Sequence, residues 1–216
     1  GVGEAFPEAP YTQAANIMLD RNCETCAAYN MLKLTKMLNN YDPEDAEYMD
    51  YYERTLYNQI LASQTPNVTD NMHNGTTYML PIGPGVRRSF GGDYDSFTCC
   101  HGTGMENHVK YQEAAYVKTA NELYVGLYLP STLTWQDKGV KVVQETSFPS
   151  SSTKMTVSEL AGASSQAFDM KLRVPYWATN GFTVKVNGET KVENPEISTY
   201  VTLTGIKAGD VITVDM

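Results

Sequence analysis

Apolar positions in the first part of the chain recur at the spacing of amphipathic helices. A helix is predicted over residues 22–38, and Asn and Pro residues at 39–43 supply a stop signal. A second helix is predicted over residues 43–63, packed against the first, with Glu53 and Arg54 facing solvent. The apolar stripe of this second helix consists of Ala46, Met49, Tyr52, Leu56 and Ile60.

A long segment rich in Asn, Gly and Pro, residues 64–98, follows these helices. It contains a single apolar run, Tyr78-Met79-Leu80. Loops of this length within a compact protein usually carry function. The segment leads into Cys99-Cys100-His101-Gly102-Thr103-Gly104, after which a third helix is predicted over residues 105–117.

Beyond Asn121 the helical spacing gives way to short runs that alternate apolar and polar residues, which is typical of strands. An Asn187-Gly188 pair predicts a tight turn between two of them. Evenly spaced strands favour a β-sandwich. The pattern therefore predicts an α+β multidomain chain, helical over residues 1–120 and an antiparallel β-sandwich over residues 121–216. The strands are predicted at residues 123–129, 140–145, 154–157, 168–174, 182–186, 200–203 and 211–214.

Composition narrows the classes of function. Of the 216 residues, 42% are hydrophobic and 19% charged, as in a globular protein. The formal net charge of -9 and a single adjacent basic pair, Arg87-Arg88, argue against nucleic acid as a partner. No apolar run reaches the ~18 residues that cross a membrane. Fifteen tyrosines suit a sugar-binding groove, and they equally suit sheets and half-buried helices.

All four cysteines lie in the helical part, as Cys23-x-x-Cys26 and the adjacent pair Cys99-Cys100. Four thiolates would make a structural zinc site if the backbone turned sharply at the glycines that follow the pair. Disulfides and buried free thiols are the alternatives. Glu24 adds a carboxylate, which zinc also accepts, so three thiolates with Glu24 would leave one cysteine over. A redox dithiol at Cys23 and Cys26 lacks the βαβ surroundings of such motifs.

Three segments, in this order, resemble the β-L-arabinofuranosidases of glycoside hydrolase family 127 and the related family 146. They are Glu24-Thr25-Cys26 with the helix after it, Tyr51-Tyr52-Glu53-Arg54-Thr55-Leu56-Tyr57-Asn58, and Cys99-Cys100-His101-Gly102-Thr103-Gly104-Met105-Glu106-Asn107-His108. The resemblance runs from Gly3 to Lys141 and more loosely to the end of the chain.

The resemblance implies roles for individual residues. Cys99 becomes the nucleophile and binds zinc together with Glu24, Cys26 and Cys100. Cys23 stands where the family commonly has Gly or Pro, and is left out of the site. The resemblance also implies that Glu4, in Gly3-Glu4-Ala5-Phe6, is the general acid/base; a second carboxylate, Glu8, lies close by in the sequence. It further implies that Tyr78 supplies a substrate-binding hydroxyl near the nucleophile. His101 and His108 lie beside the cysteines, and we interpret His108 as a structural hydrogen-bonding residue.

The resemblance also implies a fold and a reaction. Family members use an (α/α)6 barrel followed by β-sandwich modules, so residues 1–120 would be the later part of such a barrel. The implied activity is retaining hydrolysis of β-L-arabinofuranosides, with an L-arabinose-containing oligosaccharide or glycan as the partner. We expect the chain to be a piece of a longer bacterial protein, inactive and poorly stable alone because helix faces lack partners. Compartment and homo-oligomer formation stay open.

The alternative from another class is a non-catalytic module. It would be a carbohydrate-binding or structural β-sandwich with a zinc-stapled helical segment. The two hypotheses differ in what they require of Cys99: only the enzyme needs it as a nucleophile.

Overall fold

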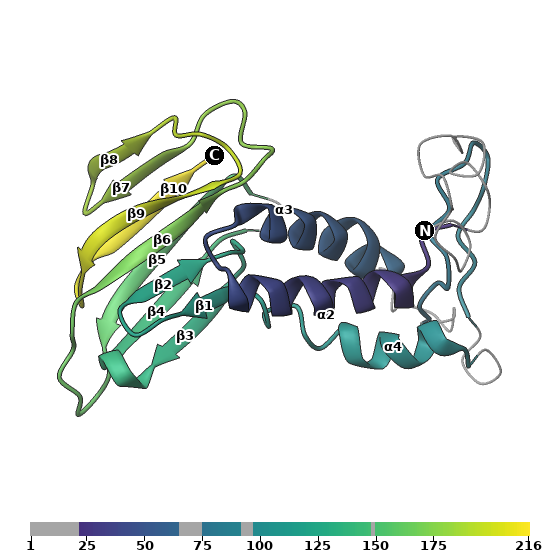
Figure 1. The fold of residues 1–216 in the computed structure, drawn as a ribbon, viewed down its shortest axis with the longest axis horizontal. Coiled ribbons are helices and arrows are strands. Elements are labelled where there is room, and N and C mark those ends of the chain that lie inside the picture. The colour runs from purple at the N-terminus through teal and green to yellow at the C-terminus, as the bar shows by residue number, and fades with distance from the viewer. Residues whose placement is uncertain (1–21, 65–74, 92–96, 148–149) are drawn as a thin grey trace. The chain divides into compact units, whose positions relative to one another are not determined.

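The computed structural model describes residues 22–64, 75–91, 97–147 and 150–216 (Figure 1). These residues form two compact units. The described residues up to 37 and from 51 to 111 belong to the first unit, and those from 38 to 50 and from 112 to 216 belong to the second. The predicted glutamate Glu4 lies outside the described residues.

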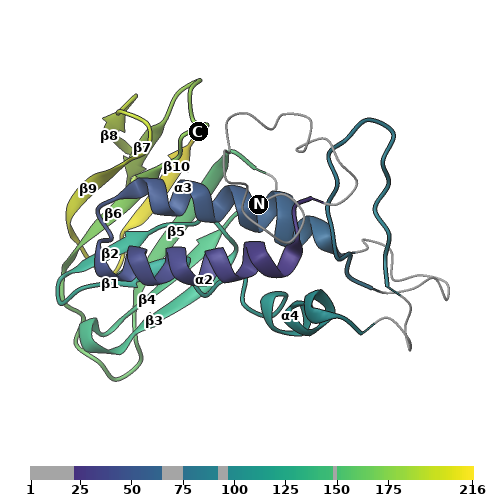
Figure 2. The same ribbon diagram turned by 45° about the vertical axis from the view of Figure 1, so that its right-hand side comes forward.

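The helical elements follow the two apolar stripes. Helix α2 spans Thr25–Tyr41 and α3 spans Ala46–Thr55, and the two lie alongside each other in Figures 1 and 2. After α3 the chain continues as a π-helical turn, Leu56–Ile60, and a 3-10 turn, Leu61–Ser63. All five residues predicted for the second stripe are buried, each with at most 4% of its surface exposed. The helical period therefore located this helix and its inner face correctly.

Two predictions in the helical part are wrong. Glu53 is buried, because it is four residues after Met49 and so takes a place within the apolar stripe; Arg54 faces solvent as predicted. The third helix, α4, spans Cys99–Asn107 and not residues 105–117. Its glycines lie inside the helix, so Cys99 and Cys100 occupy its first turn and not a sharp turn before it.

The second unit contains two sheets. The four-stranded sheet has the order β1-β2-β6-β9, and the six-stranded sheet has the order β3-β4-β5-β10-β7-β8. Every pair is antiparallel except β2 and β6, which are parallel, so the all-antiparallel prediction is wrong for this pair. The strands are β1 Tyr116–Lys118, β2 Glu122–Val125, β3 Ser131–Trp135, β4 Val140–Glu145, β5 Ser152–Glu159, β6 Phe168–Val174, β7 Thr183–Val186, β8 Glu189–Glu193, β9 Thr199–Ile206 and β10 Val211–Asp215.

A single hydrophobic cluster takes side chains from both sheets. Alternate residues of β4, β5 and β10 point into it, which produced the alternating pattern in the sequence. Asn187 and Gly188 both have positive φ, 52° and 84°, as a two-residue hairpin turn between β7 and β8 requires. Strands β1 and β3 were not predicted, because one is only three residues long and the other buries only Trp135 fully.

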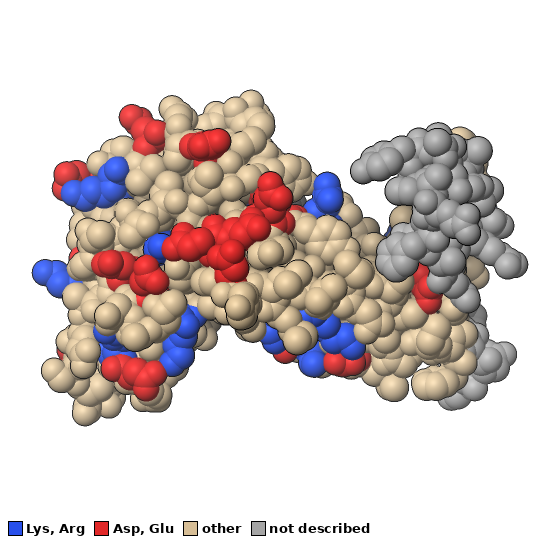
Figure 3. All heavy atoms as spheres, viewed as in Figure 1, with Lys and Arg blue, Asp and Glu red and all other residues tan. Residues whose placement is uncertain are grey.

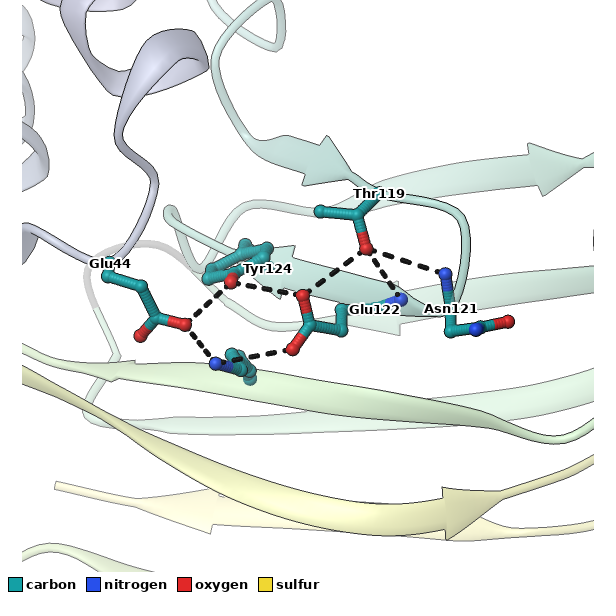
Figure 4. A network of polar contacts seen from close by, with 6 residues as sticks. Glu44, Thr119, Asn121, Glu122 and Tyr124 are labelled. Atoms are coloured by element: carbon teal, nitrogen blue, oxygen red, sulfur yellow. Dashed lines mark hydrogen bonds and ion pairs between the residues drawn. The ribbon is translucent and has the colours of Figure 1, made fainter.

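Charged residues join the segment 38–50 to the four-stranded sheet. The Lys171 ammonium on β6 contacts Glu44 and also lies 3.4 Å from Glu122 on β2 (Figure 4). The Tyr124 hydroxyl donates to Glu44 at 2.7 Å. Lys171 is largely buried, with 13% of its side chain exposed, so this network holds the loop before α3 firmly on the sheet.

A second ion pair in this unit is more deeply buried. Arg173 is fully buried on β6; its guanidinium contacts the Asp50 carboxylate, and its Nε donates to the Gly126 carbonyl at 2.7 Å. Asp50 also accepts hydrogen bonds from the Ser198 hydroxyl at 2.6 Å and the Tyr176 amide at 3.2 Å. Each buried charge therefore has several partners, which buried ions require.

On the face shown in Figure 3, the largest contiguous group of charged side chains is acidic, with Lys and Arg scattered around it. This distribution agrees with the net charge of -9. None of the described helices has the length and continuous hydrophobicity needed to cross a bilayer.

Candidate metal centre

Two helix N-termini bring the unusual residues together. Glu24 precedes α2 and Cys26 lies in its first turn, while Cys99 and Cys100 open α4. Thr98 is the N-cap residue of α4. The sequence separates these pairs by more than seventy residues, and the fold of the first unit places them side by side.

One ligand atom from each of Glu24, Cys26, Cys99 and Cys100 lies within 4.8 Å of the other three. The Cys26 sulfur is 3.5 Å from the Cys99 sulfur and 2.6 Å from the Glu24 carboxylate. That carboxylate lies 3.8 Å from the sulfur of Cys99 and 3.9 Å from that of Cys100. Tetrahedral zinc with Zn–S bonds of ~2.3 Å spaces its ligand atoms by roughly 3.5 to 3.8 Å. The donor set fits a zinc ion, and the distances of 3.5, 3.8 and 3.9 Å are close to this spacing, whereas the Cys26–Glu24 contact has the length of a thiol–carboxylate hydrogen bond.

Two thiols of this cluster, those of Cys26 and Cys100, have pKa values above that of an ordinary thiol. Burial, followed by the hydrogen bond with Glu24, raises the pKa of Cys26. Burial also raises the pKa of Cys100, and this effect outweighs the lowering effect of the neighbouring Thr25 side chain. A coordinating thiol is deprotonated, so binding a metal here would release these protons.

The cysteines of the cluster differ in their exposure to solvent. Cys100 is buried, Cys26 is half-buried and Cys99 is exposed. The Cys99 sulfur also lies 3.3 Å from the hydroxyl of Tyr78, which the long segment after the second helix supplies. Cys99 is therefore the sulfur that a molecule from solution can reach, and Tyr78 stands beside it.

Comparison with protein families decides the identity of the chain. The model of the GH127 catalytic domain of β-L-arabinofuranosidases matches residues 1–113. The chain belongs to glycoside hydrolase family 127. The GH127 middle-domain model matches residues 122–216, which contain strands β2 to β10 of the two sheets.

Solved structures agree with this assignment. A protein described as a glycoside hydrolase aligns with a TM-score of 0.74 at 25% identity over 89% of the chain. A GH127 β-arabinofuranosidase aligns with a TM-score of 0.70 at 25% identity over 90%. A GH127 β-L-arabinofuranosidase from Geobacillus stearothermophilus T6 is similar in fold, with a TM-score of 0.68 at 23% identity over 91%. The chain spans 32% of the length of each of these proteins. No curated protein matches it.

Other candidate residues of this GH127 chain lie outside the cluster. Cys23 has a left-handed backbone (φ 55°), a conformation that glycine adopts more readily. Cys23 lines a pocket of about 520 Å³ whose lining does not include the four clustered residues. All four cysteines are free thiols, and Cys26 contacts Glu24 and Cys99. His101 bonds the Thr98 hydroxyl at 2.7 Å.

His108 has partners of its own. Its ring nitrogens lie 2.7 Å from the Tyr111 hydroxyl and 3.5 Å from the Ser63 hydroxyl. Burial lowers the pKa of His108 to about 4, so the ring is neutral near pH 7 and ties α4 to the turn at residues 61–63.

Two residues that support this GH127 site were not predicted. Gln59 donates from its side-chain amide to the Glu24 carbonyl at 3.2 Å, and it does so from the π-helical turn. π-helical turns recur at functional sites, but the sequence carries no recognisable signal for them. Thr25 lies inside the Glu24-Thr25-Cys26 motif, and this position in the sequence could have marked it as a residue of the site.

The two glycines of α4 offer a test of how tightly this helix is packed. A Cβ at buried Gly104 would lie 3.1 Å from Cγ2 and 3.2 Å from Oγ1 of Thr76, whose backbone accepts a hydrogen bond from Gly91. At Gly102 the nearest atom would be 3.9 Å away. Alanine gains up to ~1 kcal/mol of helix propensity at either site, while overpacking costs ~1 to 3 kcal/mol.

We expect Gly104→Ala to be less stable than Gly102→Ala by about 1 to 2 kcal/mol. Thermal unfolding of the two variants in the full-length protein measures the difference. Equal stability of the two would show that Thr76 moves aside.

Proposed function

We propose that this chain supplies the nucleophile and the zinc ligands of a longer retaining β-L-arabinofuranosidase. The observation that carries the proposal is the cluster in which Glu24, Cys26 and Cys100 surround the one exposed sulfur, that of Cys99. A site built only to hold structural zinc has no need of an exposed ligand next to a tyrosine hydroxyl. The names of two GH127 relatives, both arabinofuranosidases, supply the substrate class.

In the proposed mechanism, hydrolysis of the glycosidic bond takes place in two steps. In the first, the Cys99 thiolate attacks the anomeric carbon, the bond to the leaving oxygen breaks, and that oxygen takes a proton from Glu4. In the second, Glu4 takes a proton from water, the water oxygen attacks the anomeric carbon, and the carbon–sulfur bond breaks. Two displacements at one carbon retain its configuration. Zinc, when held by Glu24, Cys26, Cys99 and Cys100, supplies the positive charge that keeps the thiolates deprotonated at neutral pH.

We propose further that helices α2, α3 and α4 are the later part of an (α/α)6 barrel and that the two sheets form a β-sandwich module. Large apolar side chains of the first unit are exposed, among them Met37 at 68%, Phe97 at 80% and Met105 at 70%. Exposed apolar side chains in such number commonly mark a surface that another part of a protein covers. Further helices of a longer enzyme would cover them.

Zinc content and activity together test the proposed function. The full-length protein is expected to hold about one zinc per chain by elemental analysis and to hydrolyse an aryl β-L-arabinofuranoside. Removal of zinc by a chelator should remove the activity, because the thiols regain their protons, and added zinc should restore it. An aryl α-L-arabinofuranoside serves as the control substrate. Full activity in protein that holds no metal would contradict the proposal.

A further inference from the structure

Thr25 separates two residues of the metal centre, and apart from its effect on the pKa of Cys100 it has been given no role in the chemistry above. Its side chain is buried, with 1% of its surface exposed. A threonine hydroxyl in the first turn of a helix commonly bonds to the backbone of that helix. The Thr25 hydroxyl bonds instead to a segment more than fifty residues away.

Three contacts join Thr25 to that segment. Its hydroxyl oxygen lies 3.1 Å from the carbonyl oxygen of Thr77 and 3.0 Å from that of Tyr78. A hydroxyl has one proton, so the two carbonyls share it. The backbone N–H of Thr25 also donates to the Tyr78 carbonyl, at 3.1 Å. Both donors of one residue therefore hold the peptide that carries the Tyr78 side chain.

Backbone hydrogen bonds to other residues also hold this segment. The Leu80 amide donates to the Cys23 carbonyl at 3.3 Å, and the Thr77 amide donates to the Ser63 carbonyl at 2.9 Å. The Tyr78 hydroxyl, at the end of a long side chain, lies 3.3 Å from the Cys99 sulfur. A small shift of the Tyr78 backbone would therefore break the contact with the nucleophile.

We propose that Thr25 is a positioning residue: its hydroxyl fixes the 77–80 segment so that the Tyr78 hydroxyl stays hydrogen-bonded to the Cys99 sulfur. This rests on the proposed function, in which Cys99 is the nucleophile. When the sulfur carries a negative charge, the tyrosine hydroxyl donates to it in a directional, charge-assisted hydrogen bond. That bond orients the sulfur for attack and stabilises its charge again as it leaves the sugar.

Four variants of the full-length enzyme test the proposal: Thr25→Val, Thr25→Ser, Tyr78→Phe and the double variant Thr25→Val/Tyr78→Phe. Valine keeps the shape and removes the hydroxyl, whereas serine keeps the hydroxyl. We expect Thr25→Val to lower kcat by about tenfold with KM changed less than about twofold, since one hydrogen bond is lost in the reaction and substrate contacts are kept. Thr25→Ser should stay within about threefold of the parent enzyme.

The double variant carries the decisive comparison. If Thr25 acts through Tyr78, adding Thr25→Val to Tyr78→Phe should lower kcat by no more than about twofold further. Metal content should be equal in all four variants. Hydrogen exchange measured by mass spectrometry should be faster over residues 76–80 in Thr25→Val and unchanged in Thr25→Ser.

Several results would overturn the proposal. A tenfold loss that persists in the Tyr78→Phe background would mean that Thr25 acts on the metal ligands or on the fold. Parent-like kcat or parent-like exchange in Thr25→Val would mean that the hydroxyl positions nothing. If the parent enzyme itself holds no metal or hydrolyses no arabinofuranoside, the proposed function fails, and the exchange comparison alone decides whether Thr25 fixes the segment.

Discussion

Replacing Cys99 by alanine in the full-length enzyme is expected to lower kcat for an aryl β-L-arabinofuranoside by on the order of 10⁴-fold or more, the scale seen when a covalent nucleophile is removed. The sulfur is exposed and lies beside Tyr78, and in the proposed reaction it is the atom that attacks the anomeric carbon. Alanine leaves a small space on the face of the sugar from which the thiolate attacks. Added azide should enter that space, restore cleavage of an activated substrate and give a glycosyl azide of inverted configuration.

The other cysteines provide matched controls. Cys100→Ala also removes a proposed metal ligand, but the Cys100 sulfur is buried, so azide should not rescue that variant. Cys23→Ala should retain nearly full activity, because Cys23 is not among the four clustered residues. Equal losses in Cys23→Ala and Cys99→Ala would favour a site of four thiolates. Failure of azide to rescue Cys99→Ala, with metal still bound, would contradict a nucleophilic role.

The sequence predicted those elements whose burial is periodic. The stripe from Ala46 to Ile60 and the alternating strands β4, β6 and β10 were located because each repeats a simple pattern of burial. Helix α4 was placed too late, because Gly102 and Gly104 resemble a turn. Gly104 serves instead to let the helix approach Thr76 closely, and such a contact between distant segments leaves no periodic trace.

The candidate site divides in the same way. The clustering of Cys26, Cys99 and Cys100 with Glu24 was suggested by residue chemistry together with the family motifs, since thiols and carboxylates have few common roles in such numbers. The supporting contacts of Thr25 and Gln59 could not be predicted. These contacts depend on which backbone carbonyls the fold brings within reach of a hydroxyl or an amide. Most buried polar side chains form hydrogen bonds, so the sequence does not show which carbonyl each one will bond.

The second large effect is expected in the β-rich unit: Arg173→Met should lower the free energy of unfolding by about 3 to 5 kcal/mol. Arg173 is fully buried, and Asp50 is 8% exposed. Methionine fills much of the arginine's volume, so the loss comes chiefly from charge. It leaves the Asp50 carboxylate in a desolvated site, where it still accepts hydrogen bonds from the Ser198 hydroxyl and the Tyr176 amide but has lost its positive partner. Urea unfolding of the full-length protein, followed by the signal of the β-rich unit, measures the change.

Two variants separate this loss from the general effect of removing a positive charge. Lys154→Met removes a lysine that is 52% exposed and pairs with Glu145 at 3.3 Å, and it should cost less than about 0.5 kcal/mol. Adding Asp50→Asn to Arg173→Met should recover part of the loss, because a neutral amide costs less to bury than an unpaired carboxylate. If Arg173→Met costs no more than Lys154→Met, water reaches Asp50 in the folded protein and the pair does not hold residues 38–50 on the sheet. If the double variant is less stable than Arg173→Met, the hydrogen bonds that Asp50 accepts from Ser198 and Tyr176 matter more than its charge.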